Sequence, residues 1–245
     1  MTRTLLRLSG PDTRDFLQGL ITNDVAKIDS APIYAAMLTP QGKYLADFFV
    51  LRAGGDVLLD VGATLATPFM QRLTMYKLRA KVTITTVEDQ YLHRGIDDTP
   101  DDGWPDPRHP ALGWRAWRSQ PAQADTVHWD AIRIQHLVPE NGSELTPDSF
   151  ILEHNFETLH GVDFRKGCYV GQEVTARMKH KTQLRKGLAR VAVDGATTQG
   201  ADIVVGEKIV GQLLTRAGDQ AIAYLRFDRV GQDMTCGDAR VTPLD

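Results

Sequence analysis

The order of hydrophobic patterns along the first 87 residues most strongly constrains the fold of this chain. Apolar residues alternate over short runs or recur at helical spacing, in the order strand, helix, three strands, helix, strand. This irregular order favours an α+β domain, with helices on one face of a largely antiparallel sheet, over a doubly wound parallel sheet. Strands are expected at residues 4–8, 33–38, 44–52, 57–61 and 80–87, and helices at residues 11–21 and along the apolar face Leu65, Phe69, Leu73 and Tyr76.

The C-terminal part of the chain has a different pattern. From residue 184 onward, short alternating segments are separated by single glycines, and such spacing predicts a small barrel or sandwich. The expected strands are residues 188–193, 203–205, 209–214 and 221–227. We therefore expect an α+β region of two interleaved subdomains at residues 1–183 and a β-barrel domain at residues 184–245. The first region includes an acidic, proline-rich loop at residues 97–110 and a helix near residues 127–137.

The overall charge argues against one class of protein. The 245 residues include 28 Lys or Arg and 31 Asp or Glu, which gives a formal net charge of −3. A nearly neutral chain lacks the basic surface of a protein that binds nucleic acid over its whole area. Direct binding to nucleic acid is therefore not expected from the overall charge.

Cysteine content and hydropathy indicate the compartment. The two cysteines, Cys168 and Cys236, form no disulfide framework and no CxxC pair, which favours a reducing environment. The longest apolar runs, such as residues 33–38, are far shorter than the roughly 20 residues of a membrane span. The N-terminal residues lack the apolar core of a signal peptide. We therefore expect a cytoplasmic protein that does not contact a membrane.

Positive charge is concentrated in one segment. Residues 165–190 hold eight Lys or Arg and one acid, Glu173, so the segment carries +7 and the rest of the chain −10. Such a segment is either a solvated basic face or a site for an anion, such as a carboxylate-bearing ligand, a phosphate or RNA. Tyr169 is its only aromatic residue, so no RNA-stacking motif accompanies the charge. The cations are Arg165, Lys166, Arg177, Lys179, Lys181, Arg185, Lys186 and Arg190.

Cys168 lies inside this basic segment. Neighbouring cations and a helix N-terminus both favour the thiolate, which is the reactive and metal-binding form of cysteine. Arg165 and Lys166 are candidates for the first effect, and a helix that starts near Tyr169 is a candidate for the second. The alternative is a small buried cysteine in a tight loop. Cys236 has no clustered cations around it and is expected to have no functional role.

The sequence indicates no metal or nucleotide site. The seven histidines form no HExxH pattern, and neither a Walker A nor a GxGxxG motif is present. A single thiol cannot hold an iron–sulfur cluster, because clusters generally need four cysteine ligands. If Cys168 contacts a cluster, the other ligands must come from a partner.

One segment resembles a known family closely. Residues 166–173, Lys-Gly-Cys-Tyr-Val-Gly-Gln-Glu, match the K-G-C-Y-x-G-Q-E signature of the YgfZ family. These are folate-binding proteins related to the T-protein, the aminomethyltransferase of the glycine cleavage system. Further segments resemble motifs of the same family in the expected order, so the resemblance runs from about residue 5 to residue 227. They are Phe16–Gly19 with Thr22–Val25, Leu38–Lys43 and Tyr76–Arg79.

The resemblance implies a fold and a function. The expected fold is a T-protein-like α+β body of antiparallel sheets with helices, plus a small C-terminal β-barrel, and a central hole for tetrahydrofolate. The expected function is the maturation or repair of iron–sulfur proteins, including radical enzymes that methylthiolate tRNA. The implied partners are tetrahydrofolate or a derivative and iron–sulfur client or assembly proteins. Because Cys168 matches the signature cysteine, it is the implied reactive thiol, and its surroundings are shaped by Lys166, Tyr169, Gln172 and Glu173.

The same resemblance suggests contacts for folate. Basic side chains such as Arg177 would meet its carboxylates, and Gly167 and Gly171 would allow its close approach to the backbone. Asn23, Asp24 and Glu173 are candidate acceptors for the pterin, and Tyr76 and Arg79 candidate wall residues. For several of these residues a structural role is the alternative. It is turn chemistry for Asn23 and Asp24, core packing for Tyr76 and a surface ion pair for Arg79.

One departure from the T-protein bears on catalysis. A T-protein has an essential aspartate soon after the strand that corresponds to residues 57–61, yet residues 61–87 contain no Asp or Glu. Binding of folate without aminomethyl transfer is therefore the more economical interpretation. Two alternatives stay open. A one-carbon transferase would need a carboxylate from elsewhere, such as Asp60 or Asp24, and an RNA-binding module would use residues 165–190.

Overall fold

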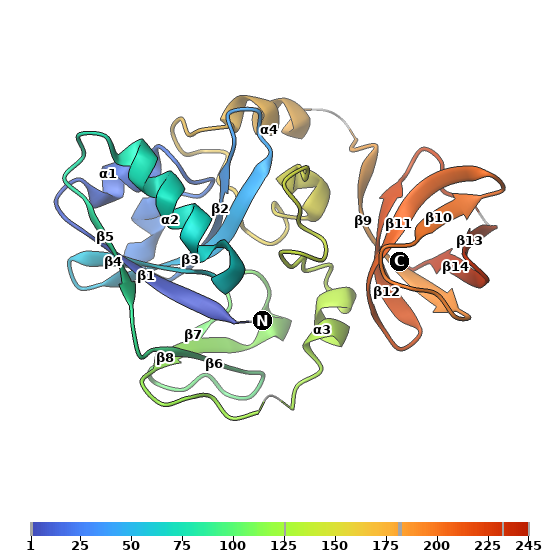
Figure 1. Ribbon diagram of the computed structural model, residues 1–245, viewed down its shortest axis with the longest axis horizontal. Coiled ribbons are helices and arrows are strands. Elements are labelled where there is room, and N and C mark those ends of the chain that lie inside the picture. Colours follow the sequence, from blue (N-terminus) through green and yellow to red (C-terminus); the bar gives the residue numbers. More distant parts are fainter. Residues whose placement is uncertain (1, 125, 181–182, 232, 245) are drawn as a thin grey trace. The chain divides into compact units, whose positions relative to one another are not determined.

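A computed structural model describes residues 2–124, 126–180, 183–231 and 233–244 (Figure 1). The chain forms two compact units. Unit one comprises Met1–Val127 and Phe156–Ala176, and unit two comprises His128–Asn155 and Arg177–Asp245. Among the described residues, no helix has both the length and the apolar character needed to cross a membrane.

Unit one is built on an antiparallel five-stranded sheet with the strand order β2-β3-β4-β1-β5. The predicted order of elements is confirmed, although α1 is shorter than the predicted helix at residues 11–21. The elements are β1 (Arg3–Ser9), α1 (Thr13–Gln18), the 3-10 helix η1 (Val25–Asp29), β2 (Ile33–Leu38), β3 (Tyr44–Ala53), β4 (Asp56–Gly62), α2 (Ala63–Lys77) and β5 (Thr83–Val87).

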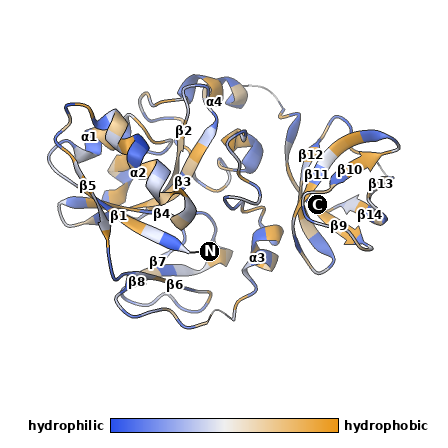
Figure 2. Ribbon diagram, viewed as in Figure 1, coloured by the Kyte–Doolittle hydropathy of each residue, from blue (hydrophilic) through white to orange (hydrophobic). Residues whose placement is uncertain are grey.

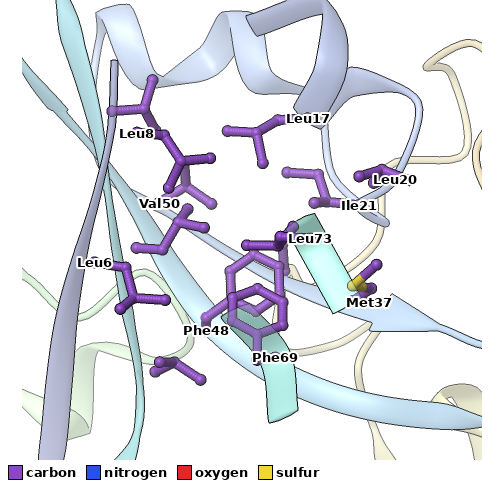
Figure 3. Close-up of a cluster of buried hydrophobic side chains, with 14 of the residues drawn as sticks. Leu6, Leu8, Leu17, Leu20, Ile21, Met37, Phe48, Val50, Phe69 and Leu73 are labelled. Carbon is purple, nitrogen blue, oxygen red and sulfur yellow. The ribbon is translucent and has the colours of Figure 1, made fainter. Parts of the chain in front are cut away.

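The apolar core of unit one lies on the face of the sheet that α1 and α2 cover (Figure 3). Leu17 of α1 and Leu73 of α2 are fully buried against strand residues such as Leu6 and Leu8. The rings of Phe48 in β3 and Phe69 in α2 pack with centroids 4.7 Å apart. Both helices thus bury their apolar faces on one side of the sheet, as the sequence pattern predicts.

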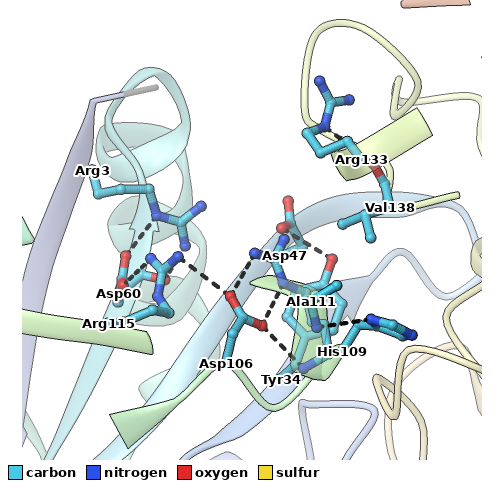
Figure 4. Close-up of polar contacts among 11 residues, drawn as sticks. Arg3, Tyr34, Asp47, Asp60, Asp106, His109, Ala111, Arg115, Arg133 and Val138 are labelled. Atoms are coloured by element: carbon cyan, nitrogen blue, oxygen red, sulfur yellow. Dashed lines mark hydrogen bonds and ion pairs between the residues drawn. The ribbon is translucent and has the colours of Figure 1, made fainter. Parts of the chain in front are cut away.

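A polar cluster occupies the opposite face of the same sheet (Figure 4). The carboxylate of Asp60 lies 2.6 Å from Arg3 and 2.7 Å from Arg115. Asp47 accepts hydrogen bonds from the hydroxyls of Tyr34 (3.1 Å) and Tyr44 (2.6 Å). Each of these carboxylates is buried and partnered, as the interior of a protein requires.

A small sheet with the strand order β6-β8-β7 belongs to the same unit and supplies Arg115 to this cluster. Residues 97–110 were expected to form a loop, but Asp106 in this segment is buried and bound to Arg108 at 2.8 Å. The loop prediction is wrong in part, because the short strand β7 lies inside the segment and Asp106 also pairs with Arg115 of β8 at 3.6 Å. The elements are β6 (Tyr91–Gly95), β7 (Trp104–Pro105), the 3-10 helix η2 (Pro110–Leu112) and β8 (Trp114–Arg118).

Unit two is a closed six-stranded barrel with the order β10-β11-β12-β9-β14-β13. The predicted C-terminal barrel is confirmed. Its strands change between hydrophobic and hydrophilic residues along their length (Figure 2), which matches the mixed burial of β9. The strands are β9 (Lys186–Asp194), β10 (Asp202–Val205), β11 (Lys208–Ala217), β12 (Gln220–Arg226), β13 (Met234–Cys236) and β14 (Ala239–Pro243).

Unit two also contains α3 (Trp129–Gln135) and the 3-10 helix η3 (Ile151–His154). The buried carboxylate of Glu144 binds Arg133 of α3 and accepts a hydrogen bond of 2.5 Å from Thr215 in β11. These contacts tie residues 128–155 to the barrel. The boundaries of the two compact units therefore differ from the expected boundary between residues 183 and 184: they follow residues 127, 155 and 176. The last helix, α4 (Gln172–Lys179), contains one of these division points.

Candidate functional site: the cysteine loop

Residues 163–171, here called the cysteine loop, present the thiol of Cys168 to solvent. Cys168 and Gly167 are exposed, whereas the flanking residues Lys166 and Tyr169 are each 7% exposed. The alternative of a buried structural cysteine is therefore wrong for Cys168. Cys236 is instead the buried one: it lies in the barrel core, with its sulfur 2.9 Å from the hydroxyl of Thr197.

The ammonium of Lys166 anchors the cysteine loop. Its Nζ donates to the carbonyl oxygens of Gln18 at 2.8 Å and Ile21 at 2.5 Å, and lies 4.9 Å from the centre of the Tyr169 ring. Burial lowers the pKa of Lys166 to about 8, although Asp24 and Asp163 act in the opposite direction. We expected Lys166 as a cation beside the thiol. Because its donors serve backbone carbonyls, Lys166 holds the loop in place, and its effect on the thiol stays a prediction.

Replacing Lys166 tests this anchor. Lys166→Met leaves two carbonyl oxygens without their donor, which costs about 2 kcal/mol. In the wild type, the folded pKa of about 8 lies below the ordinary 10.5, so the unfolded chain binds more protons between these values. Stability of the wild type therefore rises with pH across that window, and the gap to the variant widens. Urea unfolding at both ends of the window measures this gap, and a gap independent of pH would contradict the buried ammonium.

The first residue of the cysteine loop, Asp163, fixes the backbone of the residues that follow it through hydrogen bonds. One of its oxygens accepts the backbone N–H groups of Arg165 at 2.6 Å and Lys166 at 3.2 Å, and the other lies 2.6 Å from the ammonium of Lys27. Burial alone would raise the pKa of Asp163, but Lys27 and these N–H groups hold it below the ordinary value. The turn before Cys168 is thus fixed by a charged hydrogen-bond acceptor.

Thr22 and Asn23 connect the segment before the cysteine loop to β2. The hydroxyl of Thr22 donates to the carbonyl of Gly161 at 2.6 Å and accepts the N–H of Ala36 at 2.8 Å. The amide nitrogen of Asn23 donates to the carbonyls of Tyr34 and His160, both at 2.8 Å. Residues 22–23 are therefore bonded directly to residues 160–161, which immediately precede the cysteine loop in the sequence.

These contacts bear on the two predicted pterin acceptors. The amide oxygen of Asn23 accepts the N–H of Asp24 at 2.9 Å and the ammonium of Lys27 at 3.3 Å, so every polar atom of that side chain is engaged. One oxygen of Asp24 caps η1 by accepting the N–H of Ala26 at 3.0 Å, and it also accepts from Gln18 at 3.1 Å. Turn chemistry accounts for both residues, and their contact with folate stays a prediction.

The exit of the cysteine loop packs against the turn between β2 and β3. Gly171 has φ +84°, and a Cβ on it would lie 2.6 Å from the carbonyl oxygen of Thr39. Gly42 has φ +75°, and a Cβ there would lie 2.8 Å from the Cβ of Val174. Both positions therefore require glycine. The close approach that we expected of a ligand at Gly171 is made by the hairpin turn, whereas a Cβ on Gly167 would meet nothing within 4 Å.

Helix α4 begins later than predicted. It starts at Gln172, four positions after Cys168, so the thiol does not lie in its first turn. A contribution of the helix N-terminus to the thiolate is therefore not supported, because that effect is confined to the first turn. Gln172 is half-buried, and Glu173 and Arg177 are exposed on α4. Of the basic segment, Lys181 lies outside the described residues.

Tyr76 and Arg79 lie elsewhere in unit one. Tyr76 packs against the apolar core from the end of α2, as its structural alternative predicts, and Arg79 is exposed in the following turn. Among the described residues, no recorded contact joins either side chain to the cysteine loop. Their role as folate wall residues stays a prediction.

The buried carboxylates were largely missed from the sequence. Asp47 is an acid inside the apolar run Leu45–Val50, and that interruption is a signal that could have found it. Asp60 was considered as a replacement for the T-protein carboxylate, but it is fully buried with both oxygens bound to Arg3 and Arg115. It is not placed to transfer protons to a ligand. No group of three metal-ligating side chains occurs among the described residues.

Comparisons with known proteins agree with this architecture. Residues 185–245 match the family model described as CAF17, C-terminal beta-barrel domain. The iron-sulfur cluster assembly factor IBA57 homolog, mitochondrial, of Mycosarcoma maydis is 35% identical over 216 residues, or 75% of this chain and 54% of the relative. The mitochondrial IBA57 factors of Mus musculus and Homo sapiens are 27% and 28% identical, covering 93% of this chain and 76% of each relative. The chain thus spans about half the length of the fungal relatives.

A solved structure shows the fold. The glycine cleavage system aminomethyltransferase T from Bartonella henselae matches 99% of this chain and 82% of its own, with a TM-score of 0.75 and 14% identity. This confirms the predicted T-protein-like body with a C-terminal barrel. The relatives are named as IBA57 iron-sulfur cluster assembly factors, so the predicted resemblance to the YgfZ family is supported only in part, because YgfZ is the name of a bacterial relative.

The names of these relatives also correct one expectation. A reducing environment and the absence of a signal peptide predicted a cytoplasmic protein. The matching relatives from fungi and mammals are all named as mitochondrial, which contradicts that prediction. A reducing environment does not identify one compartment, so the inference from two free cysteines went too far.

Proposed function

We propose that this chain acts in the maturation or repair of iron–sulfur proteins and that Cys168 is its reactive thiol. The observation that carries the proposal is the geometry of the cysteine loop, where an exposed thiol stands between two buried, anchored residues. The names of the relatives, iron-sulfur cluster assembly factor IBA57, support the same function. A fixed and accessible thiol suits transient binding of iron or of a cluster supplied by another protein.

A partner must complete any cluster site. Cys168 is the sole cysteine of the loop, and clusters generally need four thiolate ligands. The described residues add no group of three possible metal ligands near it or elsewhere. We therefore propose that the iron–sulfur group is a substrate shared with a client or assembly protein, and that this chain provides one ligand. No client is named by the relatives, so the proposal extends to iron–sulfur proteins in general and not to tRNA modification.

The function is tested by rescue. In a strain that lacks this protein, the activity of its iron–sulfur enzymes should fall and expression of the wild-type chain should restore it. Enzymes without a cluster, assayed in the same extracts, serve as the control. Unchanged iron–sulfur enzyme activity in the deletion strain would contradict the proposal.

We further propose that tetrahydrofolate binds this chain. The T-protein fold and the match of residues 166–173 to a folate-binding family support the proposal. Of the predicted acceptors, the carboxylate of Glu173 is exposed at the start of α4, and one oxygen of Asp24 has no recorded hydrogen bond among the described residues. Arg177 is exposed on the same helix, and its contact with a carboxylate of the ligand rests on the resemblance alone. Glu173 and Asp24 offer acceptor oxygens for a ligand, whereas Asn23 is engaged elsewhere.

A calorimetric titration of the purified protein with tetrahydrofolate tests this ligand. We expect saturable binding to one site, weakened by Glu173→Gln and Arg177→Ala. Glu157→Gln, which changes an exposed acid outside α4, is the matched control. The same samples, mixed with an aminomethyl donor, should form no methylene-tetrahydrofolate, because residues 61–87 lack the T-protein carboxylate, Asp60 is bound by arginines and Asp24 caps η1. Absence of binding would remove folate from the proposal, and turnover would favour the transferase alternative.

A further inference from the structure

Helix α2 ends in an unusual turn. The N–H of Ala80 donates to the carbonyl of Lys77 at 2.8 Å, which closes a four-residue turn with Leu78 at its second position. Leu78 has φ 45° and ψ −106°. These angles are those of the first central residue of a type II′ turn, a position that glycine normally occupies. A residue with a Cβ there is strained, so the turn is held in place despite Leu78.

The strained residue exposes an apolar side chain. Leu78 is 88% exposed, and Met75, one turn earlier on α2, is 57% exposed. The opposite face of α2 buries Phe69 and Leu73 in the core. Core packing therefore requires neither Leu78 nor Met75. The strain reduces stability, and the exposed apolar side chains gain almost no burial on folding in return, which points to a role outside the fold.

The surroundings of Leu78 are positively charged. Residues 61–87 contain no acid, and four cations lie on α2 and in the turn after it. Among the described residues, no ion pair is recorded for these cations. The carboxylate of Asp12 accepts the backbone N–H of Lys81 at 2.7 Å. An apolar projection surrounded by free cations is complementary to an apolar pocket with an acidic rim. The four cations are Arg72, Lys77, Arg79 and Lys81.

We propose that the end of α2, residues 75–81, is a docking site for a protein partner that receives Leu78 in an apolar pocket bordered by acidic residues. A protein is favoured over an anionic lipid surface for two reasons. A lipid surface needs a broad apolar face, and only Met75 and Leu78 are available here. A lipid surface also requires no fixed side-chain direction, whereas the II′ turn holds Leu78 in one position. This inference rests on neither folate nor Cys168.

Leu78→Gly separates docking from folding. Glycine suits the II′ position, so the unfolding midpoint in urea should stay unchanged or increase. The docking contact should weaken at least 10-fold, because the apolar projection is lost. Ile96→Gly removes another exposed aliphatic side chain of unit one, 57% exposed, and is the matched control. Lys81→Gln should weaken docking without changing the unfolding midpoint, because it removes one charge of the surrounding cations at an exposed residue outside the folate prediction.

Docking is measured by photo-crosslinking in cells of the source organism, with p-benzoyl-phenylalanine in place of Met75. We expect one crosslinked protein whose attached peptide is flanked by Asp or Glu, and we expect the crosslink to disappear with Leu78→Gly and to weaken with Lys81→Gln. The crosslink should persist with Ile96→Gly and with Cys168→Ser, which separates this proposal from the thiol function. A crosslink that survives Leu78→Gly, a crosslink to phospholipid, or no crosslink overturns the proposal. Cosedimentation of the purified protein with phosphatidylcholine–phosphatidylglycerol vesicles would likewise overturn it.

Discussion

Cys168→Ser is expected to abolish the rescue of iron–sulfur enzyme activity in a strain that lacks this protein, and to leave the urea unfolding midpoint of the purified chain unchanged. The thiol is exposed, so its replacement by a hydroxyl removes no core packing. Serine cannot replace a thiolate as a soft metal ligand or nucleophile. The loss of function is therefore expected to be complete, although the structure of the cysteine loop is retained through Lys166 and Asp163.

Cys236 provides the matched control. Its side chain is buried in the barrel core, so Cys236→Ala keeps an apolar atom there and removes only the sulfur. This variant should rescue fully, apart from a modest decrease in stability caused by the small cavity. If Cys168→Ser restores activity as well as the wild type does, then the thiol has no part in the function. If neither variant rescues enzyme activity and both have lower urea unfolding midpoints than the wild type, the loss of rescue reflects lost stability and not lost chemistry.

Asp60→Asn is expected to be the most destabilising single substitution in the polar cluster. Asp60 is fully buried between Arg3 and Arg115, at 2.6 and 2.7 Å. Asparagine removes the charge that Arg3 and Arg115 share in the interior and leaves Arg115 only the longer contact with Asp106 at 3.6 Å, which costs about 3–5 kcal/mol. Arg115 cannot turn to solvent, because its guanidinium packs 4.0 Å from the centre of the Phe49 ring. Urea unfolding at neutral pH measures the difference.

The pH dependence of this effect has a defined sign. Burial raises the pKa of Asp60, but Arg3 and Arg115 outweigh burial and hold that pKa below its ordinary value of 3.8. The stabilisation is therefore complete above the unfolded pKa near 3.8 and is lost as the pH falls through the lower, folded value. Wild type and Asp60→Asn should differ most at neutral pH and approach each other in acid.

Asp102→Asn is the control for Asp60→Asn. Asp102 makes a bidentate pair with Arg118, with both contacts at 2.7 Å, but its side chain is 55% exposed. Exposed pairs add little to stability, so this variant should shift the midpoint far less. Equal shifts of the unfolding midpoint for the two substitutions would show that burial does not increase the contribution of the Asp60 ion pairs to stability.

The fold was predictable to a large extent because its signals are local. The strand and helix order of unit one follows from periods of two and of three to four residues. The core positions Phe69 and Leu73 were read from helical spacing alone. The barrel was predicted from glycine spacing, although the short strands β13 and β14 were not among the expected elements. Short strands carry too few alternating residues to form a pattern.

The sequence drew attention to the candidate site but did not predict its geometry. The motif around Cys168 lies in a loop that exposes the thiol, and the bonds of Lys166 to the carbonyls of Gln18 and Ile21 were not foreseen. Those acceptors are backbone atoms about 145 positions earlier in the chain, and no sequence pattern reveals which carbonyls lack a partner. For the same reason, the hairpin turn that fills the space beside Gly171 was not foreseen.

The amino-acid sequence by itself determined the secondary-structure order, the two-part organisation into an α+β body and a barrel, and the concentration of positive charge around one cysteine. These properties depend on neighbours along the chain. Only the tertiary structure decided which side chains serve the fold and which face outward. It placed Asn23, Lys166 and Asp60 in hydrogen bonds and ion pairs with distant residues, and it left Cys168 and Leu78 exposed. The burial of a side chain and its hydrogen-bond partners depend on contacts between segments far apart in sequence, and these contacts form only when the chain folds.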